Sequence, residues 1–125
     1  MPFVLIVEDS DDTAPLEIAL ASINGLNVKV LNNGRRALEL LQAAAPPDLA
    51  AVITDLHLPL LDGFDLIAAI RVQDKYRNLP IIVVSGDTDP DVRTRVRNLG
   101  ANAFFSKPYS PAEIRHTLKG LLYAP

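Results

Sequence analysis

The sequence has no cysteine and no tryptophan, and none of its apolar runs is long enough to cross a membrane. Without cysteine, the chain can form neither disulfide bonds nor thiolate metal sites, and it has no cysteine nucleophile. A membrane-spanning helix needs about 20 predominantly apolar residues. The apolar run at residues 3–7 is short and is followed by Glu8 and Asp9 without a cleavage pattern, which argues against a secretory signal peptide. We therefore predict a cytoplasmic protein with no membrane segment.

An excess of basic charge is also missing, since the net charge is -3 at pH 7. Residues 1–65 contain ten acidic and three basic side chains, whereas residues 66–125 contain five acidic and nine basic ones. The arginines at positions 93, 95 and 97 are not interleaved with aromatic residues, so we expect no direct nucleic-acid partner. A length of 125 residues suits one domain, which we place over residues 1–125.

Short apolar segments alternate with helical patterns along the whole chain. The apolar segments predict strands at residues 3–7, 28–31, 50–54, 80–84 and 103–105. Between them, apolar residues recur three or four positions apart, as in Leu16, Leu20 and Ile23, which is typical of amphipathic helices. Glycines and the Pro46–Pro47 pair punctuate these segments. Five strand–helix units in this order predict an open, doubly wound α/β domain with a parallel sheet.

In a doubly wound fold, ligands bind beyond the carboxyl ends of the strands. Glu8 and Asp9 follow the first predicted strand, Asp55 the third, Ser85 the fourth and Lys107 the fifth. Two carboxylates about 4 Å apart repel by roughly 4 kcal/mol at an effective dielectric constant of 20, so this edge calls for a cation. Oxygen ligands without histidine or cysteine favour Mg2+. The predicted site therefore suits a phosphoryl group held by Mg2+, Lys107 and the Ser85 hydroxyl.

Two other phosphate chemistries fit the sequence less well. The phosphate-binding glycine motifs of nucleotide-binding folds are absent, and acidic residues stand where such a loop would lie. The order Asp9-x-Asp11 after an apolar strand matches haloacid-dehalogenase-type phosphatases, with Asp9 as nucleophile and Asp11 as acid–base partner. The chain is short for that class, and only Glu113 is acidic after Lys107, so the downstream acidic pair is missing.

Together these residues resemble the receiver domain of response regulators in two-component signalling. The resemblance covers residues 3–122 and rests on five fragments in order, which are Glu8 with Asp9, Asp55, the turn at residues 56–63, Ser85 with Gly86, and Lys107 with Pro108. It implies a five-stranded parallel sheet in the flavodoxin-like order 2-1-3-4-5. It also predicts a cis peptide bond between Lys107 and Pro108.

The resemblance assigns a role to each residue of the site. Asp55 would accept a phosphoryl group from a sensor histidine kinase or a phosphotransfer protein, and Lys107 would contact that group. The Mg2+ ligands would be the side chains of Glu8, Asp9 and Asp55 and the backbone carbonyl of His57. Ser85 and Phe104 would form the switch. Two residues depart from the common pattern, because Glu8 replaces the more usual aspartate and Phe104 the more usual tyrosine.

The implied function is a phosphorylation switch rather than a turnover enzyme, since the domain would catalyse only its own phosphorylation and slow dephosphorylation. The switched surface would surround the fourth predicted helix (helix 4, near Val92 and Val96), the fifth strand at residues 103–105 (strand 5) and the last helix (helix 5). It would include Arg93 and Arg97, which we otherwise expect on a solvated helix face. His57 and Asp87 would flank the phosphoryl group and modulate its hydrolysis. We expect a stand-alone regulator or an excised receiver, either monomeric or dimerising on phosphorylation. A phosphorylation-independent interaction module is the remaining alternative.

Overall fold

Five parallel strands form one sheet in the order β2-β1-β3-β4-β5, as predicted. The computed structural model describes residues 2–43 and 48–123, so the Pro46–Pro47 pair lies outside the described residues. The strands are β1 (Phe3–Val7), β2 (Asn27–Leu31), β3 (Leu49–Asp55), β4 (Ile81–Ser85) and β5 (Ala103–Ser106). The helices are α1 (Ala14–Ala21), α2 (Gly34–Gln42), α3 (Gly63–Arg71), the short 3-10 helix η1 (Asp74–Tyr76), α4 (Pro90–Leu99) and α5 (Pro111–Tyr123).

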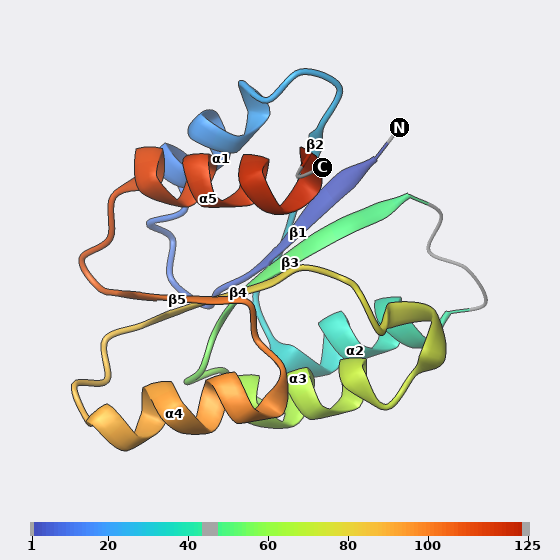
Figure 1. Cartoon of the computed structure of the whole chain (residues 1–125), viewed down its shortest axis with the longest axis vertical. Helices are drawn as coiled ribbons and strands as arrows, with labels where there is room; N and C mark the ends of the chain where they lie inside the picture. Colours follow the sequence, from blue (N-terminus) through green and yellow to red (C-terminus); the bar gives the residue numbers. More distant parts are fainter. Residues whose placement is uncertain (1, 44–47, 124–125) are drawn as a thin grey trace.

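Helices cover both faces of the sheet. Figure 1 shows α1 and α5 on one face and α2, α3 and α4 on the other. Successive strand residues point to opposite faces, so Val4 and Ile6 of β1 pack beneath α1 and α5 whereas Leu5 and Val7 pack toward α2 and α3. All four side chains are buried, which explains why the strand reads as a continuous apolar run. The fold is therefore the predicted doubly wound α/β domain.

The helix boundaries differ in places from those that periodicity predicts. The spacing of Leu16, Leu20 and Ile23 extends the first helix to Ile23, but α1 ends at Ala21. The Ile23 amide instead donates to the Leu20 carbonyl in a tighter turn, and Gly25 follows with a φ of 79° that favours glycine. Ile23 still packs in the core beneath α1 and α5. Among the described residues, no helix is long and apolar enough to span a membrane.

Candidate functional site

Strand geometry brings three charged residues to one face of the sheet at its carboxyl edge. Near the carboxyl ends of β1, β3 and β5, one side chain of each strand packs on the α1 and α5 face, namely Ile6, Ile53 and Phe105. Because side chains alternate along a strand, the residues two positions later point toward the same face. These residues are Glu8, Asp55 and Lys107.

The three side chains form one bonded cluster. The Lys107 ammonium nitrogen Nζ lies 2.6 Å from Asp55 Oδ2 and 2.9 Å from Glu8 Oε1. Asp55 Oδ1 accepts hydrogen bonds from the backbone amides of Leu56, at 2.6 Å, and His57, at 3.3 Å. The Asp55 and Glu8 side chains are only 8% and 9% exposed. Both oxygens of the Asp55 carboxylate therefore have a partner, and the side chain is largely shielded from water.

The cluster gives its two buried acids opposite proton affinities. Burial, followed by the neighbouring Asp55 carboxylate, raises the pKa of Glu8 to about 7, although Lys107 opposes this shift. Burial also acts to raise the pKa of Asp55, but hydrogen bonds with Glu8 and Lys107 outweigh it and hold the pKa below 3.8. Burial acts to lower the pKa of Lys107, but the two carboxylates raise it above its ordinary value. Asp55 is therefore the anion of the pair and Lys107 is charged near neutral pH.

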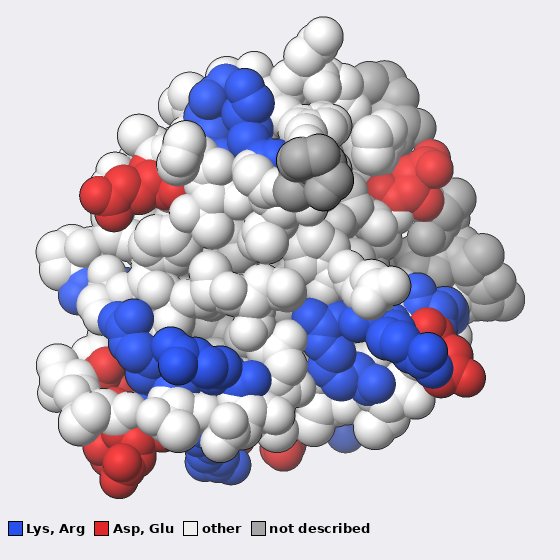
Figure 2. Space-filling view, in the orientation of Figure 1, with Lys and Arg blue, Asp and Glu red and all other residues white. Residues whose placement is uncertain are grey.

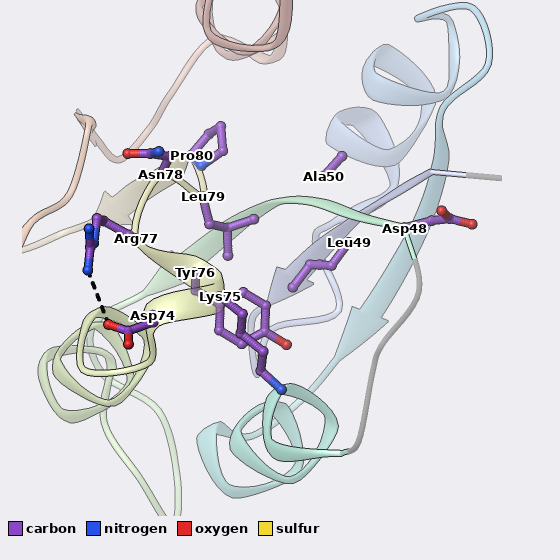
Figure 3. Close-up of a pocket in the computed structure, with 10 residues that line it drawn as sticks. All are labelled: Asp48, Leu49, Ala50, Asp74, Lys75, Tyr76, Arg77, Asn78, Leu79 and Pro80. Carbon is purple, nitrogen blue, oxygen red and sulfur yellow. Dashed lines mark hydrogen bonds and ion pairs between the residues drawn. The ribbon is translucent and has the colours of Figure 1, made fainter.

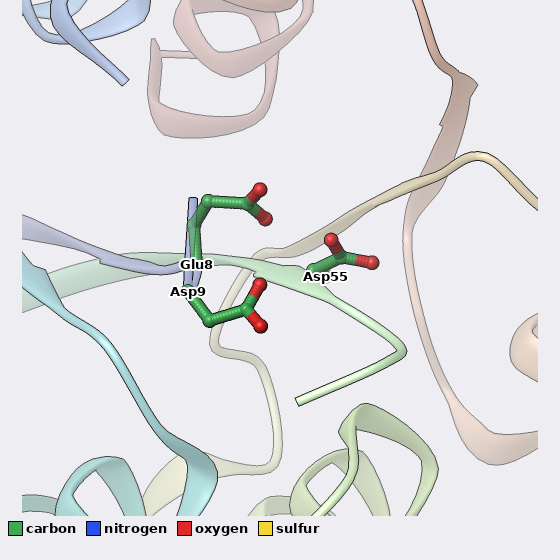
Figure 4. A group of neighbouring side chains, drawn as sticks. All are labelled: Glu8, Asp9 and Asp55. Carbon is green, nitrogen blue, oxygen red and sulfur yellow. The ribbon is translucent and has the colours of Figure 1, made fainter. Parts of the chain in front are cut away.

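The acidic residues also meet the requirements of a divalent cation. Figure 4 shows the carboxyl groups of Glu8, Asp9 and Asp55 directed toward a common space, and one oxygen from each lies within 4.8 Å of the others. Glu8 Oε2 is buried and has no hydrogen-bond partner. An unpartnered buried carboxylate oxygen is costly unless a cation neutralises it. The donor set consists of oxygens, which suits Mg2+ better than Zn2+.

The loop after β3 is held by two close backbone approaches. The Gly63 amide donates to the Leu56 carbonyl at 2.8 Å, and a Cβ atom at Gly63 would overlap the Asp55 carbonyl oxygen and lie 2.7 Å from Leu56 Cα. A Cβ atom at Gly34 would overlap the Leu61 carbonyl oxygen. Sequence reasoning missed the role of Gly34, because Asn33 and Gly34 signal only the start of a helix. These two close approaches therefore hold the loop that follows Asp55.

The two residues predicted as a switch lie on the other face of the sheet. Ser85 is fully buried, and its Oγ accepts a hydrogen bond from the Asp87 amide at 3.1 Å. Phe104 is half-buried and pairs in register with Val83, two residues before Ser85. Ser85 and Phe104 therefore point toward the α4 side, whereas Phe105 packs on the α1 and α5 side.

The predicted pair of His57 and Asp87 is also brought together. His57 Nε2 lies 3.5 Å from Asp87 Oδ2, and the His57 side chain is 66% exposed. The pair connects the β3–α3 and β4–α4 loops at the carboxyl edge.

The contacts of Lys107 bear on the phosphatase alternative. The Lys107 amine contacts Asp55 and not Asp9, and Asp11 is exposed before α1 begins. The arrangement therefore does not support the phosphatase alternative. The peptide bond between Lys107 and Pro108 is cis, as predicted.

A second hollow, of about 520 Å3, lies at the amino-terminal edge of β3 and β4. Its lining residues are Asp48, Leu49, Ala50, Asp74, Lys75, Tyr76, Arg77, Asn78, Leu79 and Pro80. Figure 3 shows that its basic side chains diverge, with Lys75 directed toward α2 and Arg77 paired with Asp74 at 3.2 Å. Since its charged groups do not converge, we place the functional site at the opposite, carboxyl edge.

Comparison with known proteins identifies the family. The family model described as the response regulator receiver domain matches residues 4–119. The two-component response regulator ORR7 of rice (Oryza sativa subsp. japonica) is 30% identical over 120 residues, and the match covers 96% of this chain and 56% of that protein. The chain thus spans little more than half the length of this relative.

Solved structures agree with this assignment. The chemotaxis response regulator CheY4 of Vibrio cholerae has a TM-score of 0.83 and 29% identity, with 98% of this chain and 99% of that chain covered. The receiver domain of the sensor histidine kinase PA1611 from Pseudomonas aeruginosa PAO1 has a TM-score of 0.82 and 27% identity, with 97% of each chain covered. That structure contains a magnesium ion in its active-site cleft. The match over residues 4–119 shows that this chain belongs to the response regulator receiver domain family.

Proposed function

We propose that this chain is the phosphoacceptor in a histidine-to-aspartate phosphorelay and that Asp55 receives the phosphoryl group. The observation that carries the proposal is the contact of Asp55 with Lys107 at 2.6 Å, beside two further acids at the carboxyl edge of the sheet. Asp55 is the acid whose pKa is held low, so it is ionised and nucleophilic near neutral pH.

In the proposed transfer, a carboxylate oxygen of Asp55 attacks phosphorus of a phosphohistidine. The new O–P bond forms as the N–P bond breaks, and the imidazole leaves with the bonding electron pair. Lys107 lies where it can neutralise charge on the phosphoryl oxygens. Glu8, Asp9 and Asp55 would hold Mg2+ together with the His57 backbone carbonyl. Bound Mg2+ would offset the negative charge of the carboxylates and the incoming phosphoryl group.

The donor in this proposal is a sensor histidine kinase or a phosphotransfer protein. Family membership supports this choice, and the similar PA1611 structure is itself the receiver domain of a sensor histidine kinase. After phosphorylation, Ser85 would turn toward the phosphoryl group, and Phe104 would move inward. The surface around α4, β5 and the start of α5, including Arg93 and Arg97, would then control a protein partner.

We also infer that His57 and Asp87 govern how quickly the aspartyl phosphate is hydrolysed. Their side chains meet at 3.5 Å, and they lie two residues beyond Asp55 and Ser85 respectively. Water that attacks the phosphoryl group would approach past these two loops at the carboxyl edge of the sheet. His57→Ala is expected to change the dephosphorylation rate while leaving Mg2+ affinity nearly unchanged, because the proposed ligand is the backbone carbonyl. Equal rates in the two proteins would remove this role.

Intact-mass labelling with acetyl phosphate tests the proposed function. Wild-type protein is expected to gain one phosphoryl group in Mg2+ and none in EDTA, and Asp55→Asn to gain none. Asp11→Asn is the matched control, because Asp11 is an exposed acid outside the bonded cluster, and it should label like wild type. Label that persists in Asp55→Asn but disappears in Asp9→Asn would favour the phosphatase. Failure of the folded wild type to label under every condition would favour the phosphorylation-independent interaction module.

A further inference from the structure

Two arginines of α4 stack on aromatic rings of neighbouring elements. The Arg93 guanidinium carbon lies 4.6 Å from the centre of the Phe104 ring on β5. The Arg95 guanidinium carbon lies 3.9 Å from the centre of the Phe64 ring on α3. Figure 2 shows the basic side chains of this part of the surface along α4. Arg93 is exposed, as expected for a solvated helix face, and it also covers an aromatic ring, which the sequence did not predict.

These stacks matter because α4 has little other packing. Val96 is its one buried residue, and Val92 and Leu99 are half-buried. A guanidinium over an aromatic face is attracted by the negative charge density of the ring. The two stacks therefore attach α4 to β5 on one side and to α3 on the other.

Phe104 is the aromatic residue that the proposed switch would move. Its ring lies on the same face of the sheet as the fully buried Ser85, in register with Val83. Arg93 contacts this ring from a helix that packs outside the sheet. Phenylalanine has no hydroxyl with which to form a hydrogen bond at the surface, unlike the tyrosine common at this position. The half-buried position of this ring therefore depends on its packing against the core and on its stack with Arg93.

We propose that Arg93 is a positioning residue that holds the Phe104 ring in this half-buried position and so stabilises the resting state of the receiver. The inference rests on the proposed function, because it assumes that phosphorylation at Asp55 draws the ring inward. Inward movement separates the ring from the guanidinium, so the stack opposes the switch. A ligand that binds the switched state must overcome this preference, and its apparent affinity falls accordingly.

Removing the stack is therefore expected to strengthen the binding of a phosphoryl mimic. With saturating Mg2+, Arg93→Ala should bind beryllofluoride about two- to fivefold more tightly than wild type, which corresponds to the free energy of an exposed cation–π contact. The sign of the change is diagnostic. Loss of a positive charge by itself would weaken the binding of this anionic group.

Two controls assign the effect to the ring. Arg95→Ala removes the same charge and an arginine–aromatic stack from the same helix, but its partner Phe64 lies on α3, so this variant should bind beryllofluoride no more tightly than wild type. In a Phe104→Ala background, Arg93→Ala should no longer tighten binding, because the ring that it holds is gone. Tightening that persists in that background would assign the effect to general loosening of α4 and not to the ring.

The titrations are followed by 1H–15N NMR. An affinity of Arg93→Ala equal to or weaker than that of wild type overturns the proposal, as does equal tightening in Arg95→Ala. Absence of beryllofluoride binding at Asp55 in wild type would instead contradict the proposed function. Relaxation dispersion on the ligand-free proteins keeps the inference testable in that case. Arg93→Ala should increase exchange at Phe104 and Ser85, and unchanged exchange would count against Arg93 as a positioning residue.

Discussion

The α1 and α5 side of the sheet and the α4 side are packed in different ways. On the first side, α1 buries Leu16 and Leu20, and α5 buries Ile114 and Leu118. On the second side, α4 buries Val96, half-buries Val92 and Leu99, and is further attached by two exposed arginine–aromatic stacks. The carboxylate cluster at Asp55 lies on the face covered by α1 and α5, whereas Phe104 packs on the face that α4 covers. We infer that a fixed site receives the phosphoryl group and a weakly packed helix responds to it.

The largest expected effect is the loss of unfolding free energy when an apolar side chain is shortened, compared between α5 and α4. Leu118→Ala is expected to reduce the free energy of unfolding by about 2–5 kcal/mol, because it leaves a cavity in the core. Val92→Ala in α4 should cost about 1 kcal/mol or less, because Val92 is only half-buried. Urea unfolding measures both values. Equal losses would show that the two sides do not differ in packing strength.

A smaller loss of stability is expected at Gly63, whose backbone lies close to that of Asp55 and Leu56. Gly63→Ala places a methyl group against the Asp55 carbonyl and Leu56 Cα, so it should reduce stability by about 1–3 kcal/mol and slow phosphorylation. Gly86→Ala is the matched control, since a Cβ atom at Gly86 meets no heavy atom within 4 Å. If the two alanine variants unfold at the same urea concentration, the close approach at Gly63 is not structurally important.

The third prediction concerns the pH dependence of stability at Glu8. The raised pKa, about 7 against 4.5, means that the folded protein favours neutral Glu8, so stability is lost as pH rises from about 4.5 to about 7. Asp55 has a lowered pKa and acts in the opposite sense, but its window lies at or below pH 3.8. Glu8→Gln should therefore be more stable than wild type by roughly 1–2 kcal/mol at pH 8 without metal.

Two comparisons decide whether charge at Glu8 is the cause. At pH 4 the difference between Glu8→Gln and wild type should nearly disappear, because both side chains are then neutral. Saturating Mg2+ should stabilise wild type more than Glu8→Gln, because only the wild type offers the charged ligand. A stability difference that is constant from pH 4 to pH 8 would contradict the raised pKa.

The smallest expected effect is at the α4 stacks. Arg93→Ala and Arg95→Ala should each lower the free energy of unfolding by about 0.5–1 kcal/mol, since both contacts are exposed. Arg97→Ala, also on the exposed side of α4, provides the reference for simple loss of charge and helix packing. Differential scanning calorimetry resolves such changes, and equal melting temperatures for all three variants would remove the stacks as a stabilising feature.

Much of this architecture could be predicted from sequence because the rules involved are local. Continuous apolar runs mark strands that are buried on both faces, and the residues after each run lie at one edge of a parallel sheet. These rules predict that Glu8, Asp55 and Lys107 lie close together, and the contacts of Lys107 with both acids confirm this prediction. The predicted strand order and the cis bond before Pro108 are also confirmed.

The features that could not be predicted depend on the geometry of one turn or on contacts between distant segments. The end of α1 at Ala21 is set by the turn through Gly25, whereas periodicity alone continues to Ile23. Gly34 lies 27 positions before Leu61 in the chain, and only the packed backbone shows why a side chain is excluded there. The stack of Arg93 on Phe104 joins a helix to a strand, so its spacing in the sequence carries no signal.

The central claim is that a phosphoryl group bound at Asp55, on the α1 and α5 face, changes the weakly packed helix α4 on the other face. The most direct test maps 1H–15N chemical-shift changes when beryllofluoride and Mg2+ bind the wild-type protein. Beyond the residues that touch the ligand, the largest changes should occur at Ser85, Phe104 and along α4, whereas Leu20 and Leu118 should change little. Changes confined to α1 and α5, with α4 unaffected, would contradict the account.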